Sequence, residues 1–219
     1  FLQNDLLAQA SARNQARGGM APDPDIKVRT LLDRASTKLE ARFSAQPLVE
    51  AATRRTLGYT YSELGMHPQG VREYRRSLEL YRKNLGDDHA QTLHTSAGLA
   101  WEHQEMGDFS AAEPLNKAAF EGLKRVKGPE HPETIRAMRD LGVLYARMGR
   151  TDESLPLIEQ ALALDKKVLG ADHPETLRTM ENLGHLYRLN GRLHESQTTL
   201  EECLDRRIKV DGENHPDTK

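Results

Sequence analysis

Apolar residues recur three and four positions apart along most of this chain, in segments that short turns with glycine and proline separate. This spacing gathers apolar side chains on one face of an α-helix, whereas a half-buried strand alternates at every second residue. No window alternates in that way, so the sequence predicts an all-α fold. The expected helices are 25–43, 47–64, 68–84, 90–106, 109–126, 132–148, 152–168, 174–190 and 193–210.

Two motifs recur along the chain at a constant step of 42 residues. The segments LGDDHAQTL, KGPEHPETI, LGADHPETL and DGENHPDTK begin at Leu85, Lys127, Leu169 and Asp211. The segments RTLGYTYSELG, AGLAWEHQEMG, RDLGVLYARMG and ENLGHLYRLNG begin at Arg55, Ala97, Arg139 and Glu181. A fixed period of this length indicates a stacked repeat array, because each unit can bury its apolar face only against its neighbours.

Each repeat is predicted to hold two helices. The first begins at a His-Pro step, where Pro132 suits the first helical position and Glu133 the positive helix end. It ends at a glycine such as Gly149, which fits a left-handed C-terminal cap. The array is expected over residues 25–219, as one leading helix, four helix pairs and the start of a fifth. Residues 1–24 are expected to form a short helix and a flexible linker.

Small residues keep the same step and are expected where the helices cross. The three sets are Gly58, Ala100, Gly142 and Gly184; Ser77, Ala119, Ala161 and Cys203; and Gly70, Ala112, Ser154 and Ser196. Leucines such as Leu141 and tyrosines such as Tyr145 lie beside them at helical spacing, so they are expected to be buried. Ala35 falls in the same phase as Ser77, which extends the pattern to the leading helix.

The L-G-x-x-Y run, the small crossing residues and the two-helix units resemble tetratricopeptide repeats, whose familiar unit has about 34 residues. The longer period and the D-H-P-[DE]-T linker resemble the kinesin-light-chain variety. The resemblance implies a right-handed superhelical solenoid with a concave groove. The chain departs from the pattern where tryptophan is typical, with Arg54, Ser96, Met138 and Met180, and keeps the asparagine of the kinesin light chain only at Asn182.

The first 65 residues resemble a different context, the region that follows the membrane segment in bacterial receptor-like serine/threonine kinases. The segment FLQNDLLAQA, a linker and the leading helix carry this resemblance. It implies a parent chain with an N-terminal kinase domain, and a location on the extracytoplasmic side of a bacterial membrane. Without that parent, the protein is expected in the cytoplasm.

Composition narrows the classes of function. The formal net charge is −2, so bulk electrostatics predict no binding to nucleic acid or to anionic membranes. The apolar runs are far shorter than a membrane span, so no direct insertion is expected. The single cysteine, Cys203, excludes an internal disulfide and a cysteine-based metal site.

No catalytic motif is present, because the sequence lacks a phosphate-binding glycine loop, H-R-D, D-F-G and H-E-x-x-H. The repeated histidines His89, His131, His173 and His215 could be metal ligands by type, but one repeat separates each from the next. They are therefore predicted to be turn and cap residues. Cys203 is predicted to be a buried crossing residue rather than a reactive thiol. The expectation is a non-enzymatic chain without metal or cofactor.

The first helices of the repeats are expected to line the concave groove, where arginine favours carboxylates through bidentate contacts. The candidate binding residues are Arg55, His94, Trp101, Arg136, Arg139, Arg178, Asn182 and His185. They predict a scaffold that binds an acidic peptide or protein, with Asn182 pairing with the peptide backbone. The alternative is a solvated face whose arginines pair with Asp140 and Glu181. Trp101 is either an anchor for the partner or a packing residue.

A second class of function is self-association without a separate ligand. The last predicted helix places Leu200, Leu204 and Ile208 on one face at a spacing of four. The helix that would cover this face begins at Pro216, close to the end of the sequence. We therefore expect the last helix to fray or to pack against another copy of the chain.

Overall fold

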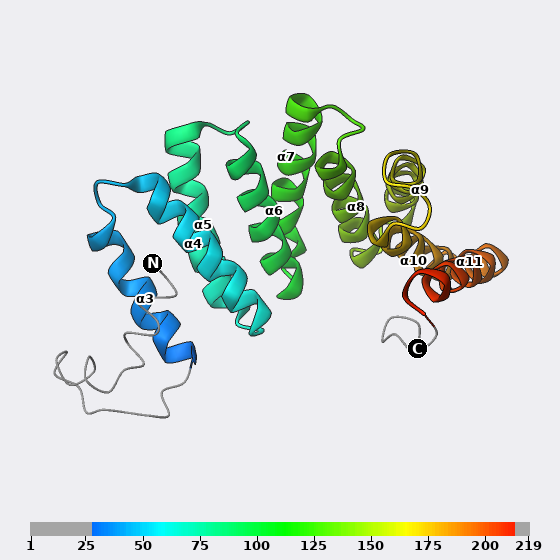
Figure 1. Ribbon diagram of the computed structural model, residues 1–219, viewed down its shortest axis with the longest axis horizontal. Helices are drawn as coiled ribbons and strands as arrows, with labels where there is room; N and C mark the ends of the chain where they lie inside the picture. The colour runs from blue at the N-terminus through cyan, green and yellow to red at the C-terminus, as the bar shows by residue number, and fades with distance from the viewer. Residues whose placement is uncertain (1–27, 213–219) are drawn as a thin grey trace. The chain divides into compact units, whose positions relative to one another are not determined.

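The computed structural model describes residues 28–212, and every element in this range is a helix (Figure 1). The helices are α3 (Val28–Arg42), α4 (Pro47–Glu63), α5 (His67–Leu85), α6 (Ala90–Glu105), α7 (Phe109–Lys127), α8 (Pro132–Arg147), α9 (Thr151–Val168), α10 (Pro174–Leu189) and α11 (Leu193–Asp211). The predicted all-α class is confirmed. The expected short N-terminal helix and the fifth HPDT copy lie outside the described residues.

The chain forms two compact units, which divide after Met106. Unit 1 holds α3 to α6, with α5 packed against both α4 and α6. Unit 2 holds α7 to α11, in which each helix packs against the next along the chain. Short turns join the helices of each unit, so consecutive helices lie side by side (Figure 1). The expected domain limits at residues 24 and 25 stay a prediction.

The repeated D-H-P-E-T motif builds the turn that starts a first helix, as the turn before α10 illustrates. Gly170 has a φ of +93°, and His173 is the N-cap of α10. The His173 Nδ1 atom accepts a hydrogen bond from the Glu175 backbone N–H at 3.1 Å. Thr176 Oγ1 donates back to the Gly170 carbonyl at 2.8 Å. The motif therefore satisfies polar backbone groups on both sides of the turn.

The histidine cap recurs at the turns before α6 and α8. His89 accepts from the N–H of Gln91, and His131 accepts from that of Glu133, both at 3.2 Å. The prediction that these histidines are turn and cap residues is confirmed, while His215 lies outside the described residues.

The threonine contact recurs only before α6, where Thr92 Oγ1 donates to the Gly86 carbonyl at 2.7 Å, because Thr134 Oγ1 has no hydrogen-bond partner among the described residues. The threonine contact was not predicted, although its place in the repeated motif could have indicated it.

The first helices end as expected at glycines in the left-handed region. Gly149 has a φ of +75°, and its N–H donates to the Ala146 carbonyl at 3.0 Å. The next N–H, of Arg150, donates to the Tyr145 carbonyl at 2.9 Å. These are the two reversed hydrogen bonds of a glycine C-terminal cap, and they turn the chain into the second helix.

The small residues occupy the helix crossings, as predicted. A Cβ atom added to Gly142 on α8 would lie 2.7 Å from Ile158 Cδ1 on α9, and one added to Gly184 would lie 2.6 Å from Leu200 Cδ2. Ser154 Oγ donates to the Gly142 carbonyl at 2.7 Å, which adds a hydrogen bond at the point of closest approach. Cys203 is buried, and its thiol donates to the Leu177 carbonyl at 3.3 Å.

The leading helix α3 docks on the first repeat through both apolar and polar contacts. Leu32 and Leu39 of α3 are buried in one cluster with Leu57 and Tyr61 of α4. Ala35 is 1% exposed, in agreement with its predicted crossing position. The leading helix therefore behaves as the second helix of a repeat, because it covers the apolar face of α4.

Candidate functional site

In unit 1, the three predicted groove residues lie on α4 and α6 in different environments. Arg55 is half-buried, and its Nη1 donates to Gln91 Oε1 at 2.5 Å. His94 is also half-buried, whereas Trp101 is 50% exposed. The guanidinium of Arg55 is thus held within the unit, while the Trp101 ring remains accessible.

In unit 2, four of the predicted residues reach the surface. Arg136 on α8 is exposed. Arg178 on α10 is exposed, and its Nη2 lies 2.6 Å from Glu175 Oε2. His185 is exposed with its Nε2 3.9 Å from Glu181 Oε1, and Asn182 is half-buried beside it. Arg178 is thus paired with an acid of its own helix, and Arg136 lies close enough to Asp140 for its charge to act on the pKa of that carboxyl.

Arg139 differs from the expectation of a groove residue, because it is 2% exposed. Its Nη2 lies 2.8 Å from Glu175 Oε2, and its Nη1 donates to Thr179 Oγ1 at 3.1 Å. Asp165 Oδ2 of α9 lies 4.0 Å from the same Nη1 and accepts from Thr179 Oγ1 at 2.6 Å. Arg139 therefore joins α8 to α9 and α10 and does not face a partner.

Burial and the neighbouring arginines act in opposite directions on the pKa values of the acids around Arg139. It raises the pKa of Asp165 above its ordinary value, although the Thr179 hydroxyl and Arg139 oppose this shift. Burial likewise raises the pKa of Asp140, which lies 3.8 Å from Arg139 Nε. For Glu175 burial is the largest influence and acts upward, but the charges and hydrogen bonds of Arg139 and Arg178 outweigh it, so its pKa is lowered. Arg139 is thus paired within the chain, but as a buried residue with Glu175 and not as part of the solvated face that the alternative described.

An apolar hollow of about 190 Å³ lies between α8, α9 and α10, beside two of the predicted residues. Val143, Ala146, Ile158 and Leu186 give it apolar walls, while the polar side chains at it are Arg147, Ser154, Asn182 and His185. Asn182 and His185 were predicted as groove residues, but the hollow itself was not. The sequence held one indication of the hollow. Val143 is a smaller side chain at the repeat position that Tyr59, Trp101 and His185 hold in the other first helices.

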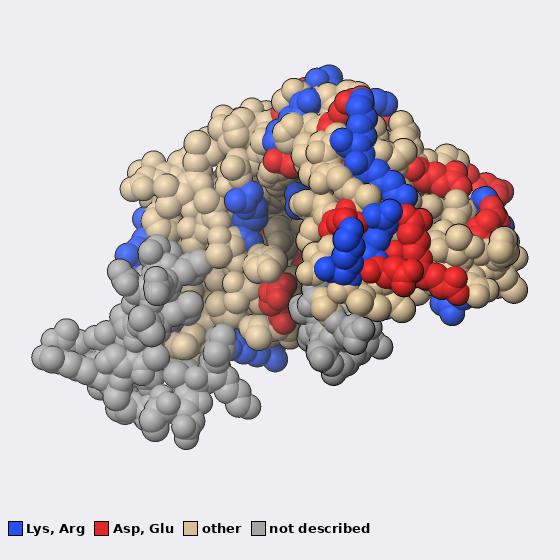
Figure 2. All heavy atoms as spheres, turned by 45° about the vertical axis from the view of Figure 1, so that its right-hand side comes forward, with Lys and Arg blue, Asp and Glu red and all other residues tan. Residues whose placement is uncertain are grey.

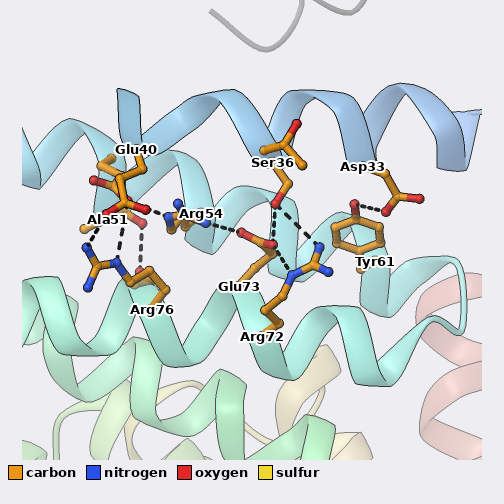
Figure 3. A network of polar contacts seen from close by, with 12 residues as sticks. Asp33, Ser36, Glu40, Ala51, Arg54, Tyr61, Arg72, Glu73 and Arg76 are labelled. Atoms are coloured by element: carbon orange, nitrogen blue, oxygen red, sulfur yellow. Dashed lines mark hydrogen bonds and ion pairs between the residues drawn. The ribbon is translucent and has the colours of Figure 1, made fainter. Parts of the chain in front are cut away.

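A buried polar network joins α3, α4 and α5 in unit 1 (Figure 3). Arg54, at a position where the family has tryptophan, lies 2.7 Å from Glu50 Oε1 and 2.9 Å from Glu73 Oε2. Ser36 Oγ of α3 donates to Glu73 Oε1 at 2.6 Å, and Tyr61 donates to Asp33 at 2.8 Å. The donors and acceptors of these side chains are paired with one another. The network therefore holds the leading helix in place and is not a candidate binding site.

Charged side chains of both signs are interspersed over the later helices, in the view that brings them forward (Figure 2). Ion pairs account for part of this mixture, since Arg206 lies 2.6 Å from Asp172, and Arg150 lies 2.9 Å from Glu113. No helix among residues 28–212 has the length and apolar character needed to cross a membrane. Within the same residues, no cluster of three or more histidine, cysteine or acidic side chains could bind a metal ion.

Antiparallel helix pairs with a constant period, glycine-capped first helices and small crossing residues define a helical repeat protein. The family model for the tetratricopeptide repeat matches residues 49–125, 103–167 and 141–209. The chain belongs to the tetratricopeptide repeat family. Its fold is that of a protein–protein interaction scaffold.

Solved structures of helical repeat proteins resemble the chain along most of its length. BtubC (BKLC) from P. vanneervenii is 20% identical with a TM-score of 0.72, over 96% of this chain and 82% of that one. A protein of Podosopora anserina assigned as a kinesin light chain is 22% identical with a TM-score of 0.70, over 96% of both chains. MamA is 16% identical with a TM-score of 0.59, over 92% of this chain and 97% of that one. No curated protein sequence matches the chain.

Proposed function

We propose that this chain binds an extended peptide segment of a protein partner along the first helices of unit 2, without catalysis. The observation that carries the proposal is the apolar hollow between α8, α9 and α10. Its volume of about 190 Å³ suits one apolar side chain, and Asn182 and His185 beside it offer polar groups for the adjoining peptide backbone. A small apolar recess with a few polar groups is typical of peptide binding sites.

We propose that the partner segment carries acidic residues beside this hollow. Arg136 and Arg178 are exposed on α8 and α10, and Arg147 lies at the hollow itself. Arginine forms bidentate contacts with carboxylates, so these side chains favour aspartate or glutamate next to the apolar anchor. Arg139 is left out of this surface because it is buried.

A peptide-display selection on the whole chain tests the proposal. We expect the selected peptides to share an apolar residue flanked by acids, and their affinity to be measured afterwards by fluorescence polarisation. Ala146→Phe should weaken binding because it fills the hollow, and Arg136→Glu should weaken it because it repels the acids. Arg75→Glu, on an exposed position of α5, is the matched control and should leave affinity unchanged. Selected peptides that bind Ala146→Phe as well as the original chain would refute this site.

A second candidate function, self-association, has one observation in its favour. Of Leu200, Leu204 and Ile208, which were expected to form an open face, only Leu204 is exposed, at 44%, while Leu200 and Ile208 are half-buried and Leu200 packs at Gly184. Leu193 and Val210 of the same helix are 65% and 47% exposed. Exposed apolar side chains of this size are a common feature of protein contact surfaces. Sedimentation velocity over a range of protein concentrations separates the two functions, since self-association requires no added peptide.

The kinase context is part of the proposal and rests on the resemblance of residues 1–65 alone. In that context, the repeats would be the sensor or docking region of a membrane-anchored bacterial serine/threonine kinase. The gene sequence upstream of these residues tests whether the parent protein is a kinase. A kinase domain followed by an apolar span would support the context, and another type of domain would overturn it.

A further inference from the structure

Two exposed aromatic side chains occupy equivalent positions on neighbouring first helices of unit 1. Tyr59 on α4 is 59% exposed, and Trp101 on α6 is 50% exposed. The two residues are one repeat apart in the sequence. The single tryptophan of the chain is therefore paired with a tyrosine at the position where unit 2 has Val143 and His185.

The helices that carry these rings approach each other closely over Tyr74 of α5. A Cβ atom on Gly58 would lie 2.8 Å from the Tyr74 ring, and one on Gly98 would lie 2.6 Å from the opposite edge of that ring. Tyr74 is itself buried and thus fills the space between the two glycines. Tyr59 follows Gly58 directly, and Trp101 is one turn beyond Gly98, so the backbone positions that carry both rings lie beside this contact.

A carboxylate follows each exposed ring by one helical turn. Glu63 is four residues after Tyr59, and Glu105 is four residues after Trp101, and both acids are exposed. Residues at this spacing lie on the same side of a helix. A hydrogen bond to Glu63, followed by its charge, raises the pKa of Tyr59, which agrees with the side chains being adjacent.

Other aromatic rings of the described chain already carry cations of the chain itself. Arg150 lies 4.3 Å from the Tyr145 ring centre, and Arg192 lies 4.3 Å from that of Tyr187. Within residues 28–212, no lysine or arginine is found over Tyr59 or Trp101. Arg55, one turn before Tyr59, is instead directed to Gln91 by its 2.5 Å hydrogen bond.

We propose that Tyr59 and Trp101, each with the carboxylate one turn away, bind arginine side chains of an extended segment of a protein partner. The ring face attracts the guanidinium through its quadrupole, and Glu63 or Glu105 accepts its hydrogen bonds. The inference rests on the proposed function, because it assigns the corresponding helix positions of unit 1 to the same kind of partner. It gives that partner basic residues at unit 1 and acidic residues at unit 2.

Trp101 makes the test direct, since the fluorescence of a chain with one tryptophan reports on this position alone. The probe is a blocked peptide of alternating arginine and glycine, titrated into the whole chain. The comparison peptides replace arginine with citrulline, which is neutral and almost the same shape, or with glutamate. We expect the arginine peptide to change the emission in a saturable way, and the citrulline peptide to bind roughly 3- to 10-fold more weakly.

Variants locate the contact. Glu63→Gln together with Glu105→Gln, and separately Tyr59→Leu, should each weaken the arginine peptide roughly 3- to 10-fold. The matched control is Glu79→Gln with Glu121→Gln, which removes two exposed acids from second helices and should have no effect. Trp101→Leu, followed with a fluorescently labelled peptide, should also weaken binding. Circular dichroism of each variant verifies that the helices remain folded.

The outcomes distinguish this inference from the function on which it rests. Equal binding of the arginine and citrulline peptides, or tighter binding of the glutamate peptide at Trp101, would overturn the inference. If display-selected acidic peptides still bound in a manner sensitive to Ala146→Phe, the proposed function would survive that result. Saturable arginine binding that depends on Glu63 and Glu105 would support the inference, even if no acidic peptide bound unit 2.

Discussion

At Gly142, a missing side chain determines how closely α8 and α9 can pack. A methyl group there would lie 2.7 Å from Ile158 Cδ1 and 3.3 Å from Leu157 Cβ. We expect Gly142→Ala to destabilise the protein by about 1–3 kcal/mol, because overpacking forces side chains from their rotamers and separates the helices. Urea unfolding followed by circular dichroism measures this change. A substitution on an exposed site of the same helix, Arg136→Ala, should have an effect within about 0.5 kcal/mol.

Arg139 illustrates a charged residue whose contribution is structural. We expect Arg139→Met to destabilise the fold by about 3–5 kcal/mol, since it leaves Asp165 and the Glu175 region without their buried cation. Arg136→Met, three residues earlier and exposed, should stay within about 0.5 kcal/mol. Equal unfolding midpoints for the two variants would contradict the assignment of Arg139 to a buried network.

The contrast between Gly142 and Arg139 indicates what a single sequence reveals about individual residues. The crossing glycines were predictable, because close packing of two helices leaves no alternative to a small side chain at that point. The environment of Arg139 was not, because helical spacing gives the direction of a side chain but not what covers it. Here Glu175 and Thr179 of α10 cover the guanidinium, and their contact depends on how two repeats stack.

At the scale of elements, the turns before α6, α8 and α10 each combine a positive-φ glycine, a histidine cap and a threonine. We expect Thr176→Val to destabilise unit 2 by about 1 kcal/mol, because the Gly170 carbonyl keeps only the longer hydrogen bond from the His173 N–H at 3.4 Å while the shape of the side chain is retained. Thermal unfolding is a suitable measurement. Thr198→Val, in which an exposed hydroxyl bonds only to its own helix, serves as control and should change little.

The helix limits themselves followed closely from the sequence. Glycine at the C-terminal caps and proline at the first helical position are strong boundary signals, and the constant period repeats each of them several times. The turn at Gly170 contains a hydrogen bond that the spacing of apolar residues could not predict. Its hydrogen bond from Thr176 crosses six residues, and nothing in the apolar pattern requires a hydroxyl there.

At the scale of the whole molecule, the two proposed partner surfaces differ in chemistry although they use equivalent first-helix positions. Unit 1 has exposed aromatic rings with acids one turn away, and unit 2 has an apolar hollow with arginines near it. The sequence predicted the helices, and its candidate residues include Trp101, Asn182 and His185 but not Tyr59, Glu63 or Glu105. It did not identify the hollow, because a recess depends on the size of side chains from three helices at once.

The last prediction concerns α11, which among the described residues packs chiefly against α10 and reaches α9 through an ion pair of Lys166 with Glu202 at 3.7 Å, whereas α9 packs against both α8 and α10. A helix with one principal neighbour and exposed leucines opens at a lower free energy than one between two neighbours. In dilute protein, we therefore expect amide hydrogens of residues 193–210 to exchange faster than those of residues 152–168. Exchange in α11 that slows as protein concentration rises would favour self-association through Leu193 and Leu204. Exchange that is faster than in α9 at every concentration would favour the peptide scaffold, while equal protection of both helices in a dilute monomer would contradict the prediction.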